Sequence, residues 1–184
     1  MRHDLDRMAL LVIDVQAGLD DPSHGARNNP DCEANIAALL AAWRSRGRPV
    51  VFVRHDSVRP DSTLRPGRPG NAFKDVVSGA PDLLVVKHVN SAFFGEPDLH
   101  AWLQERGITG VATTGIQTNY CVEATARTAS DLGYDTIFVL DATHTFDLPA
   151  HGGGVISADE LARVTATNLQ GEFADVLLTA DLLG

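Results

Sequence analysis

Short apolar segments alternate with amphipathic helical segments along almost the whole chain, and this alternation limits the possible folds most strongly. The apolar segments are rich in β-branched residues and contain few charged ones, as is typical of strands buried on both faces of a parallel sheet. Helices between successive parallel strands form right-handed crossovers. We therefore predict an α/β fold, with a doubly wound, mostly parallel six-stranded sheet and helices on both faces. The predicted strands are residues 8–13, 49–53, 83–87, 110–114, 136–140 and 174–178.

Capping signals locate the helices between these strands. Asn29 is a suitable N-cap residue, Pro30 suits the first helical position, and Gly47 is placed to end that helix. Ser157 and Glu160 have the spacing of a capping box, which opens the last helix. The predicted helices are residues 30–46, 97–106, 119–132 and 157–169.

The length of the chain bounds its domain organisation. Its 184 residues suffice for one full hydrophobic core and are few for two domains. No long repeat and no linker interrupts the pattern, so we predict a single domain spanning residues 1–184. Residues 55–81 form a long stretch rich in Pro and Gly. Such an insert in a compact domain is usually a functional loop or a subunit contact.

Charge and composition exclude several classes of partner. The formal net charge of -9 argues against binding to nucleic acid or to an anionic membrane surface. No apolar run approaches the roughly 20 residues that span a bilayer. The first residues are charged and do not have the layout of a signal peptide, so we expect a cytoplasmic protein. Its two cysteines, Cys32 and Cys121, are then expected to be free thiols, and Cys32 has no evident role.

Three chemically capable residues fall at or after the carboxyl ends of predicted strands, where open α/β sheets place their ligand sites. Asp14 follows the first strand, Lys87 ends the third, and Cys121 follows the strand that ends at Thr114. Each residue alone has a more ordinary interpretation. The aspartate suits a turn, the lysine a solvated edge, and the cysteine a small core position.

The position of Cys121 favours a chemical role. It lies in the first turn of a predicted helix, just after a strand and the turn at Gly115. Backbone N–H groups at a helix N-terminus lack helical partners, and the positive end of the dipole favours a thiolate. We therefore expect an increased reactive fraction of this thiol and N–H groups able to bind an oxyanion.

Four ordered segments resemble the isochorismatase-like cysteine hydrolases, a family that includes nicotinamidases, N-carbamoylsarcosine amidohydrolase and ureidoacrylate hydrolases. The fold of that family is a Rossmann-like three-layer sandwich. The resemblance implies that Asp14 is the general base, Cys121 the nucleophile and Lys87 the residue that orients and stabilises both. The matching segments are ALLVIDVQ, VVKHVNSAFFG, TGIQTNYCVEATARTASDLGY and VLDATHTFD.

The same resemblance implies further features. A cis peptide between Ile116 and Gln117 would direct the Gln117 N–H, together with the Cys121 N–H, at the oxyanion. Members of the family are commonly oligomeric, so we expect a homo-oligomer, with residues 55–81 as a contact or a lid. Isochorismatase itself cleaves a vinyl ether and lacks the cysteine. Cys121 therefore favours hydrolysis of a C–N bond.

The strand end at His55 bears on a possible metal. Nicotinamidases of this family bind a metal through an aspartate, a histidine two residues later and a second histidine. The sequence here, Val53-Arg54-His55-Asp56-Ser57, lacks that spacing. We predict no metal and no other cofactor. His55 is then a residue of the substrate pocket or a solvated residue.

Several residues close to the three chemical residues could form the walls of a substrate pocket. For His55 the sequence favours a solvated or capping role. For the others a structural role, as a loop anchor or a buried aromatic residue, is about equally compatible with the sequence. The candidate pocket residues are Gln16, His55, Asn90, Phe93, Tyr120, His144 and Phe146.

The sequence therefore predicts a cysteine-dependent hydrolase of a small amide, ureido or carbamoyl compound, acting through a thioester. One alternative is a metal-assisted amidase of the nicotinamidase type. An alternative of another class is a non-catalytic α/β module that binds a small ligand, because a fold alone does not specify function. The joint presence of Asp14, Lys87 and Cys121 favours the enzyme.

Overall fold

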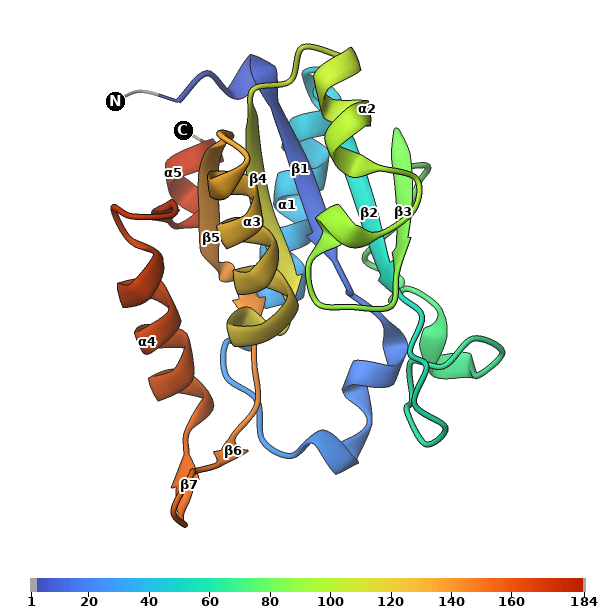
Figure 1. The fold of residues 1–184 in the computed structure, drawn as a ribbon, viewed down its shortest axis with the longest axis vertical. Coiled ribbons are helices and arrows are strands. Elements are labelled where there is room, and N and C mark those ends of the chain that lie inside the picture. Colours follow the sequence, from blue (N-terminus) through green and yellow to red (C-terminus); the bar gives the residue numbers. More distant parts are fainter. Residues whose placement is uncertain (1–2, 184) are drawn as a thin grey trace.

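The computed structural model describes residues 3–183 and contains the six-stranded sheet that the sequence predicts (Figure 1). The strand order is β3-β2-β1-β4-β5-β8, and all five neighbouring pairs run parallel. The predicted α/β fold with a doubly wound sheet is confirmed. The strands of this sheet are β1 (Met8–Ile13), β2 (Val50–His55), β3 (Leu83–Lys87), β4 (Gly110–Ile116), β5 (Asp135–His144) and β8 (Asp175–Leu177).

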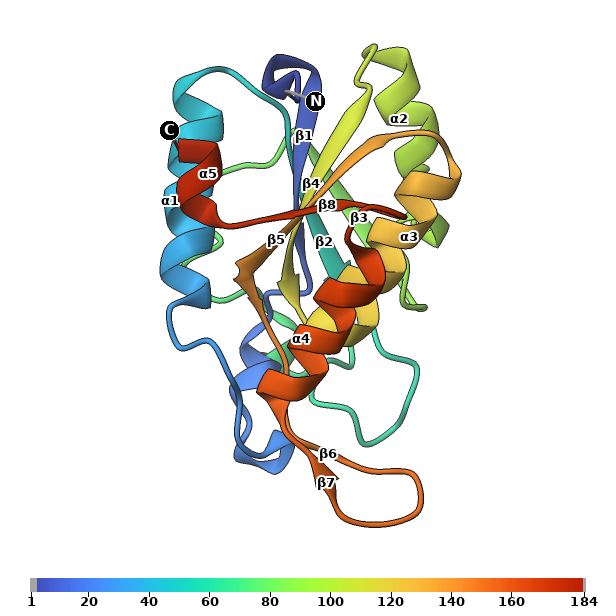
Figure 2. The same ribbon diagram turned by 90° about the vertical axis from the view of Figure 1, so that its left-hand side faces the viewer.

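Helices cover both faces of the sheet and form the outer layers of a three-layer structure (Figure 2). On one face lie α1 (Cys32–Ser45) and α5 (Thr179–Leu183), and on the other lie α2 (Leu99–Glu105), α3 (Glu123–Asp131) and α4 (Ala158–Leu169). Every residue of β1 is buried, because this central strand contacts helices on both sides. The continuous apolar run of the sequence has this physical cause.

Two helices begin later than the capping signals predict. The N-cap of α1 is Asp31, not Asn29. Asn29 instead adopts a left-handed conformation, with φ of 49°, and donates hydrogen bonds to the backbone carbonyls of Asp141 and Thr143. The helix α2 begins at Leu99 rather than near Pro97, and the Asp98 side chain caps it by accepting from the Ala101 N–H.

The strand β5 is longer than its predicted range. An irregularity in the pairing of β4 with β5 shifts the register after Thr113, which lets β5 continue to His144.

Other elements also differ from the prediction. The predicted helix 119–132 is divided into a π-helical turn, Thr118–Val122, and α3. The β6–β7 hairpin (Leu148–Pro149 and Val155–Ile156) and α5 are additional. Short 3-10 turns complete the elements: Leu5–Arg7, Ala17–Asp20, Pro22–His24, Pro69–Asn71 and Ala92–Phe94.

The long segment after β2 folds back over the carboxyl ends of the strands. Asn71 fixes it by donating to the carbonyls of His55 and Leu64 and to the Asp56 carboxylate. An isolated antiparallel bridge between Gln16 and Phe73 joins the end of the segment to the residues after β1. These contacts bring the segment beside the residues at the ends of β1 and β2.

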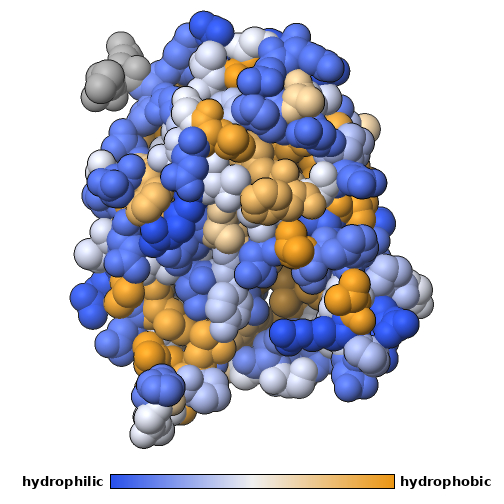
Figure 3. Space-filling view, in the orientation of Figure 1, coloured by the Kyte–Doolittle hydropathy of each residue, from blue (hydrophilic) through white to orange (hydrophobic). Residues whose placement is uncertain are grey.

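The helices and the outer surface relate to the predictions about a membrane and about an oligomer. Within residues 3–183 no helix has the length and apolarity needed to cross a membrane. On the face shown in Figure 3, polar side chains predominate and apolar ones form separate groups, one of them beside α4 and the β6–β7 hairpin. The homo-oligomer stays a prediction.

Candidate active site

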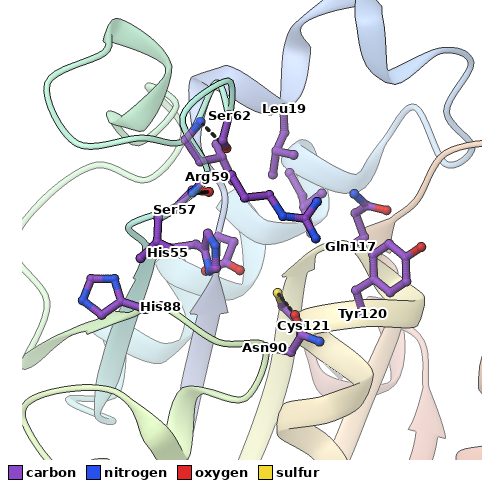
Figure 4. Close-up of a pocket in the computed structure, with 14 residues that line it drawn as sticks. Leu19, His55, Ser57, Arg59, Ser62, His88, Asn90, Gln117, Tyr120 and Cys121 are labelled. Carbon is purple, nitrogen blue, oxygen red and sulfur yellow. Dashed lines mark hydrogen bonds between the residues drawn. The ribbon is translucent and has the colours of Figure 1, made fainter.

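Asp14 and Cys121 line one cavity at the carboxyl edge of the sheet, which Figure 4 shows around Cys121, and Lys87 forms an ion pair with Asp14. Asp14 follows β1, Lys87 is the last residue of β3, and Cys121 lies in the π-helical turn after β4. Parallel strands end at the same edge, which brings these three distant positions together. The cavity has a volume of about 540 Å³.

Asp14 and Lys87 form a buried ion pair. The Lys87 ammonium donates to Asp14 Oδ2 at 2.6 Å, and the two side chains are 0% and 2% exposed. The same ammonium also contacts the Val89 carbonyl at 3.1 Å and His55 Nδ1 at 3.3 Å, so three partners surround its three N–H groups. The other carboxylate oxygen, Asp14 Oδ1, is buried and accepts no hydrogen bond from residues 3–183. One oxygen of Asp14 is therefore fixed, and the other is available as an acceptor.

The backbone around Asp14 is held in a tight arrangement. Asp14 has a positive φ of 53°, its N–H donates to the Val53 carbonyl, and its own carbonyl accepts from the Gln16 N–H. On the neighbouring strand, Gly115 has a φ of 120°, and a Cβ atom there would overlap with the Ile13 carbonyl. The ends of β1 and β4 therefore approach each other more closely than a side chain at position 115 would permit.

The Cys121 thiol lies close to this carboxylate. Cys121 Sγ, a carboxylate oxygen of Asp14 and a ring nitrogen of His55 lie within 4.8 Å of one another. The thiol also donates to Asn90 Oδ1 at 3.8 Å. The turn that carries the cysteine is tied to its surroundings through Thr125, whose hydroxyl donates to the Cys121 carbonyl and accepts from the Ala92 N–H.

The ionisation of Cys121 differs from the sequence expectation. Burial and the negative charge of Asp14 raise the pKa of the Cys121 thiol to about 12, and the opposing effect of Lys87 is smaller. The expectation that the helix N-terminus increases the thiolate fraction was wrong for this site. The reason is that desolvation and a nearby carboxylate outweigh a helix terminus. With this pKa, the thiol is protonated near neutral pH.

His55 is a neutral contact of the ion pair. Burial and the positive charge of Lys87 lower the pKa of His55. Because Lys87 is the donor, His55 Nδ1 is the acceptor of their hydrogen bond. Asp14, His55 and Cys121 together offer three potential metal ligands, but the Lys87 ammonium already contacts the first two. A metal cation at these atoms would face a buried positive charge.

The peptide between Ile116 and Gln117 is cis, as the resemblance implies. Both residues and Cys121 line the cavity. The Gln117 side chain accepts a hydrogen bond from the Thr145 hydroxyl at 3.3 Å. The segment that connects β4 to the π-helical turn therefore forms one wall of the cavity.

The structure places three of the seven candidate pocket residues in the lining of the cavity. His55, Asn90 and Tyr120 line the cavity. Gln16 does not, because its side chain makes structural hydrogen bonds: it donates to the carbonyls of His55 and Asn71 and accepts from the His55 N–H. Phe93 also lies elsewhere, in the hydrophobic core beneath α2 and α3, where its ring stacks on Tyr134.

His144 and Phe146 were also assigned wrongly to the pocket. His144 is completely buried, and neither ring nitrogen has a hydrogen-bond partner among residues 3–183. Its ring packs edge-on against Phe146, which in turn stacks on His24. The extended β5 and the register shift carry these two residues past the cavity. Cys32, expected to have no role, is a fully buried residue of the core around α1.

Sequence reasoning missed most of the cavity wall that the segment after β2 contributes. The Pro/Gly content identified residues 55–81 as a functional loop, but not which of its side chains face inward. Figure 4 shows several of them around the cavity opposite Cys121. The lining residues that were not predicted from the sequence are Leu19, Ser57, Val58, Arg59, Ser62, Leu64 and His88, besides Ile116.

Comparisons with known proteins agree with this geometry. Residues 8–169 match the family model of the isochorismatase domain. The chain is 35% identical to the uncharacterized isochorismatase family protein YrdC of Bacillus subtilis, covering 97% of this chain and 95% of that protein.

Solved structures show the same likeness. A structure described as a hydrolase of the isochorismatase family, from Chromobacterium violaceum, is 43% identical, with a TM-score of 0.94 over 100% of this chain and 95% of the other. A cysteine hydrolase from Pseudomonas syringae is 26% identical, with a TM-score of 0.87 over 100% of this chain and 93% of the other. The chain therefore belongs to the isochorismatase family of hydrolases.

Proposed function

We propose that this hydrolase cleaves the C–N bond of a small amide, ureido or carbamoyl compound, with Cys121 as the nucleophile. The observation that carries the proposal is the placement of the Cys121 thiol near Asp14, one of whose carboxylate oxygens is held by Lys87 while the other has no partner. A protonated thiol needs a base within reach, and Asp14 Oδ1 offers one.

The first half of the reaction forms a thioester. Asp14 accepts the thiol proton as Cys121 Sγ attacks the carbonyl carbon, which gives a tetrahedral intermediate. The N–H groups of Gln117 and Cys121 stabilise its oxyanion, an interaction of about 3–4 kcal/mol for one donor where it has been measured. The C–N bond then breaks, and Asp14 returns the proton to the leaving nitrogen.

The second half consumes one water molecule. Asp14, again a carboxylate, takes a proton from that water as its oxygen attacks the thioester carbon. The C–S bond breaks, the acid product is released, and the proton held by Asp14 returns to the Cys121 sulfur. Lys87 keeps the carboxylate in place through both halves and supplies the counter-charge that a buried carboxylate requires.

The geometry favours this function over the two alternatives. A module that only binds ligand has no need of a buried carboxylate oxygen without a partner beside a thiol, an arrangement that costs stability. A metal-assisted amidase of the nicotinamidase type needs an aspartate and a histidine two residues later, a spacing that residues 53–57 lack, and His55 Nδ1 already contacts the Lys87 ammonium.

The test is turnover of a panel of small carboxamides and ureides, measured as ammonia release. We expect Cys121→Ala and Cys121→Ser to abolish turnover while the thermal unfolding temperature stays close to that of the wild type. Cys32→Ala is the matched control, because that cysteine lies in the core outside the cavity. Mass spectrometry of the quenched wild type should find the acyl group on Cys121. Turnover of Cys121→Ala at the wild-type rate would eliminate the nucleophile assignment.

A further inference from the structure

Arg59 directs its side chain into the cavity from the loop that follows β2. Figure 4 shows its guanidinium extending across the cavity toward the side of Gln117, with Cys121 on the opposite wall. The arginine comes from a part of the chain that none of the proposed catalytic residues occupies.

Arg59 is an exposed residue at the rim of the cavity, and its guanidinium has no protein partner among residues 3–183. It makes no hydrogen bond and no salt bridge with them, although a guanidinium carries five N–H donors. Some other arginines of the chain are paired with carboxylates, among them Arg27 with Glu33, Arg48 with Asp6 and Arg127 with Glu123. Arg59 therefore offers its donors to whatever occupies the cavity.

The loop around Arg59 is held in place by hydrogen bonds. The Arg59 N–H donates to the Ser57 hydroxyl oxygen, and the Arg59 carbonyl accepts from the Ser62 N–H. At the tip of the loop, Arg68 donates to the carbonyls of Pro60 and Asp61. Hydrogen bonds within the loop therefore fix the backbone at Arg59. None of these hydrogen bonds involves the guanidinium.

The charged groups around the cavity determine which charge of ligand it favours. Asp14 is the single carboxylate among the residues that line the cavity, and Lys87 compensates it. His55 is held neutral, since its pKa is lowered, and His88 Nδ1 contacts the Asp56 carbonyl. The Arg59 charge is thus uncompensated, in a chain whose formal net charge is -9. A cavity of this polarity favours an anionic ligand.

We propose that Arg59 is a specificity-determining residue that binds a carboxylate of the substrate. This inference rests on the proposed function and names its substrate class: amides or ureides that carry a carboxylate away from the scissile C–N bond. A guanidinium matches a carboxylate with two parallel N–H···O bonds. One arginine balances one carboxylate, whereas a phosphate of nearly two charges would call for a second free cation in the cavity.

The first experiment measures recognition without turnover. In a Cys32→Ala background at pH 9, Cys121 is alkylated with N-bromoacetylglycine or with its neutral analogue N-bromoacetylglycinamide, which differ only in the carboxylate. We expect the anionic reagent to react faster by about tenfold or more, the effect of one hydrogen-bonded charge pair. In Arg59→Gln the ratio of the two rate constants should fall to about one.

The matched control is Arg65→Gln. Arg65 is an exposed arginine of the same loop that does not line the cavity, so its removal changes the net charge equally. The rate ratio of this variant should equal that of the wild type. A ratio that persists in Arg59→Gln, or rate constants that both fall by the same factor, would overturn the proposal.

A second measurement separates this inference from the proposed function. Calorimetry measures binding of N-carbamoylglycine and N-carbamoylglycinamide to Cys121→Ser, with and without Arg59→Gln. We expect the acid to bind more tightly than its amide, and the difference to vanish with Arg59. Equal affinities would overturn the role of Arg59 even if amides are hydrolysed. A difference that depends on Arg59, without any turnover in the panel, would leave Arg59 as an anion-binding residue and reject the amidase.

Discussion

Lys87 donates to one carboxylate oxygen of Asp14 at 2.6 Å, and the other oxygen accepts no hydrogen bond from residues 3–183. The pair thus divides the carboxylate into an anchored oxygen and a free one. Because both side chains are buried, neither can be lost without leaving a charge in a medium that solvates it poorly. The ion pair therefore both holds the Asp14 side chain in position and leaves one of its oxygens able to accept a proton.

Removal of the Asp14 charge should reduce catalysis strongly and preserve the fold at a cost in stability. Asn is nearly isosteric with Asp and tolerates the positive φ of this position, so Asp14→Asn should fold, although less stably because the Lys87 ammonium loses its counter-charge. Without the base, kcat/KM for amide substrates should fall by about 10²- to 10⁴-fold, as measured by ammonia release. A loss of less than tenfold would contradict the assignment of Asp14 as the base.

The same variant should change the thiol in a defined direction. The Asp14 charge helps raise the pKa of the Cys121 thiol to about 12, so Asp14→Asn should lower that pKa. Thiolate absorbance in the ultraviolet, recorded against pH in a Cys32→Ala background, measures it. The variant would then be less active although its thiolate fraction at a given pH is larger. An unchanged or higher thiol pKa would contradict the electrostatic contribution of Asp14.

Lys87→Met should destabilise the protein by about 3–5 kcal/mol, because it leaves the Asp14 carboxylate buried without its counter-charge. The double variant Asp14→Asn/Lys87→Met should recover much of that loss, since it buries no charge at this position. Urea unfolding of the wild type, both single variants and the double variant gives the coupling free energy. All three variants should lose most of the wild-type activity. Additive losses of stability would show that the two side chains do not depend on each other.

Gly115→Ala should disturb the site through the backbone. An added Cβ would overlap with the Ile13 carbonyl, a backbone group of the paired strand, and Ala is strained at this positive φ, so we expect a loss of about 2–5 kcal/mol and of activity. Gly133→Ala is the control, because Gly133 also has a positive φ, of 87°, but open space around it. Its cost should be about 1 kcal/mol, with activity retained. Chemical denaturation compares the two, and equal losses would reject the close approach of β1 and β4.

His144 should make the fold sensitive to mild acid. Burial, followed by the positive charge of Arg27, lowers the pKa of His144 to about 3 despite the opposing effect of Glu33. An unfolded chain binds this proton near pH 6.5, so the stabilising contribution is complete above about pH 6.5 and is lost as the pH falls toward 3. The free energy of unfolding should therefore decrease between pH 7 and pH 5.

His144→Leu should make that decrease shallower, as measured by urea unfolding at each pH. Glu33, whose pKa is lowered to about 2, keeps its full stabilising contribution above about pH 4.5 and loses it only below that pH, which lies outside this range. The exposed His151 provides the control, and His151→Leu should keep the wild-type slope. A slope unaffected by His144→Leu would show that this histidine does not set the acid sensitivity.

The strand pattern of the sequence predicts the residues of the cavity wall only in part. The pattern of the strands places Asp14, Lys87 and Cys121 correctly, because residues that end parallel strands must meet at one edge. The same logic failed for His144, since an irregular pairing lengthened β5. It also failed for Gln16, whose side chain satisfies backbone groups at the end of β2 and in the following loop.

The order of strands and helices, the buried β1 and the ends at which the chemical residues lie are determined by the local sequence. Hydrophobic period and capping residues act over a few neighbours and can be read there. Other features depend on contacts between residues far apart in the chain. They are the protonation of the Cys121 thiol, the Asp14 oxygen that accepts no hydrogen bond from residues 3–183, and the direction of the Arg59 side chain. Only the tertiary structure decided them, because burial and charge proximity exist only once the strands have assembled.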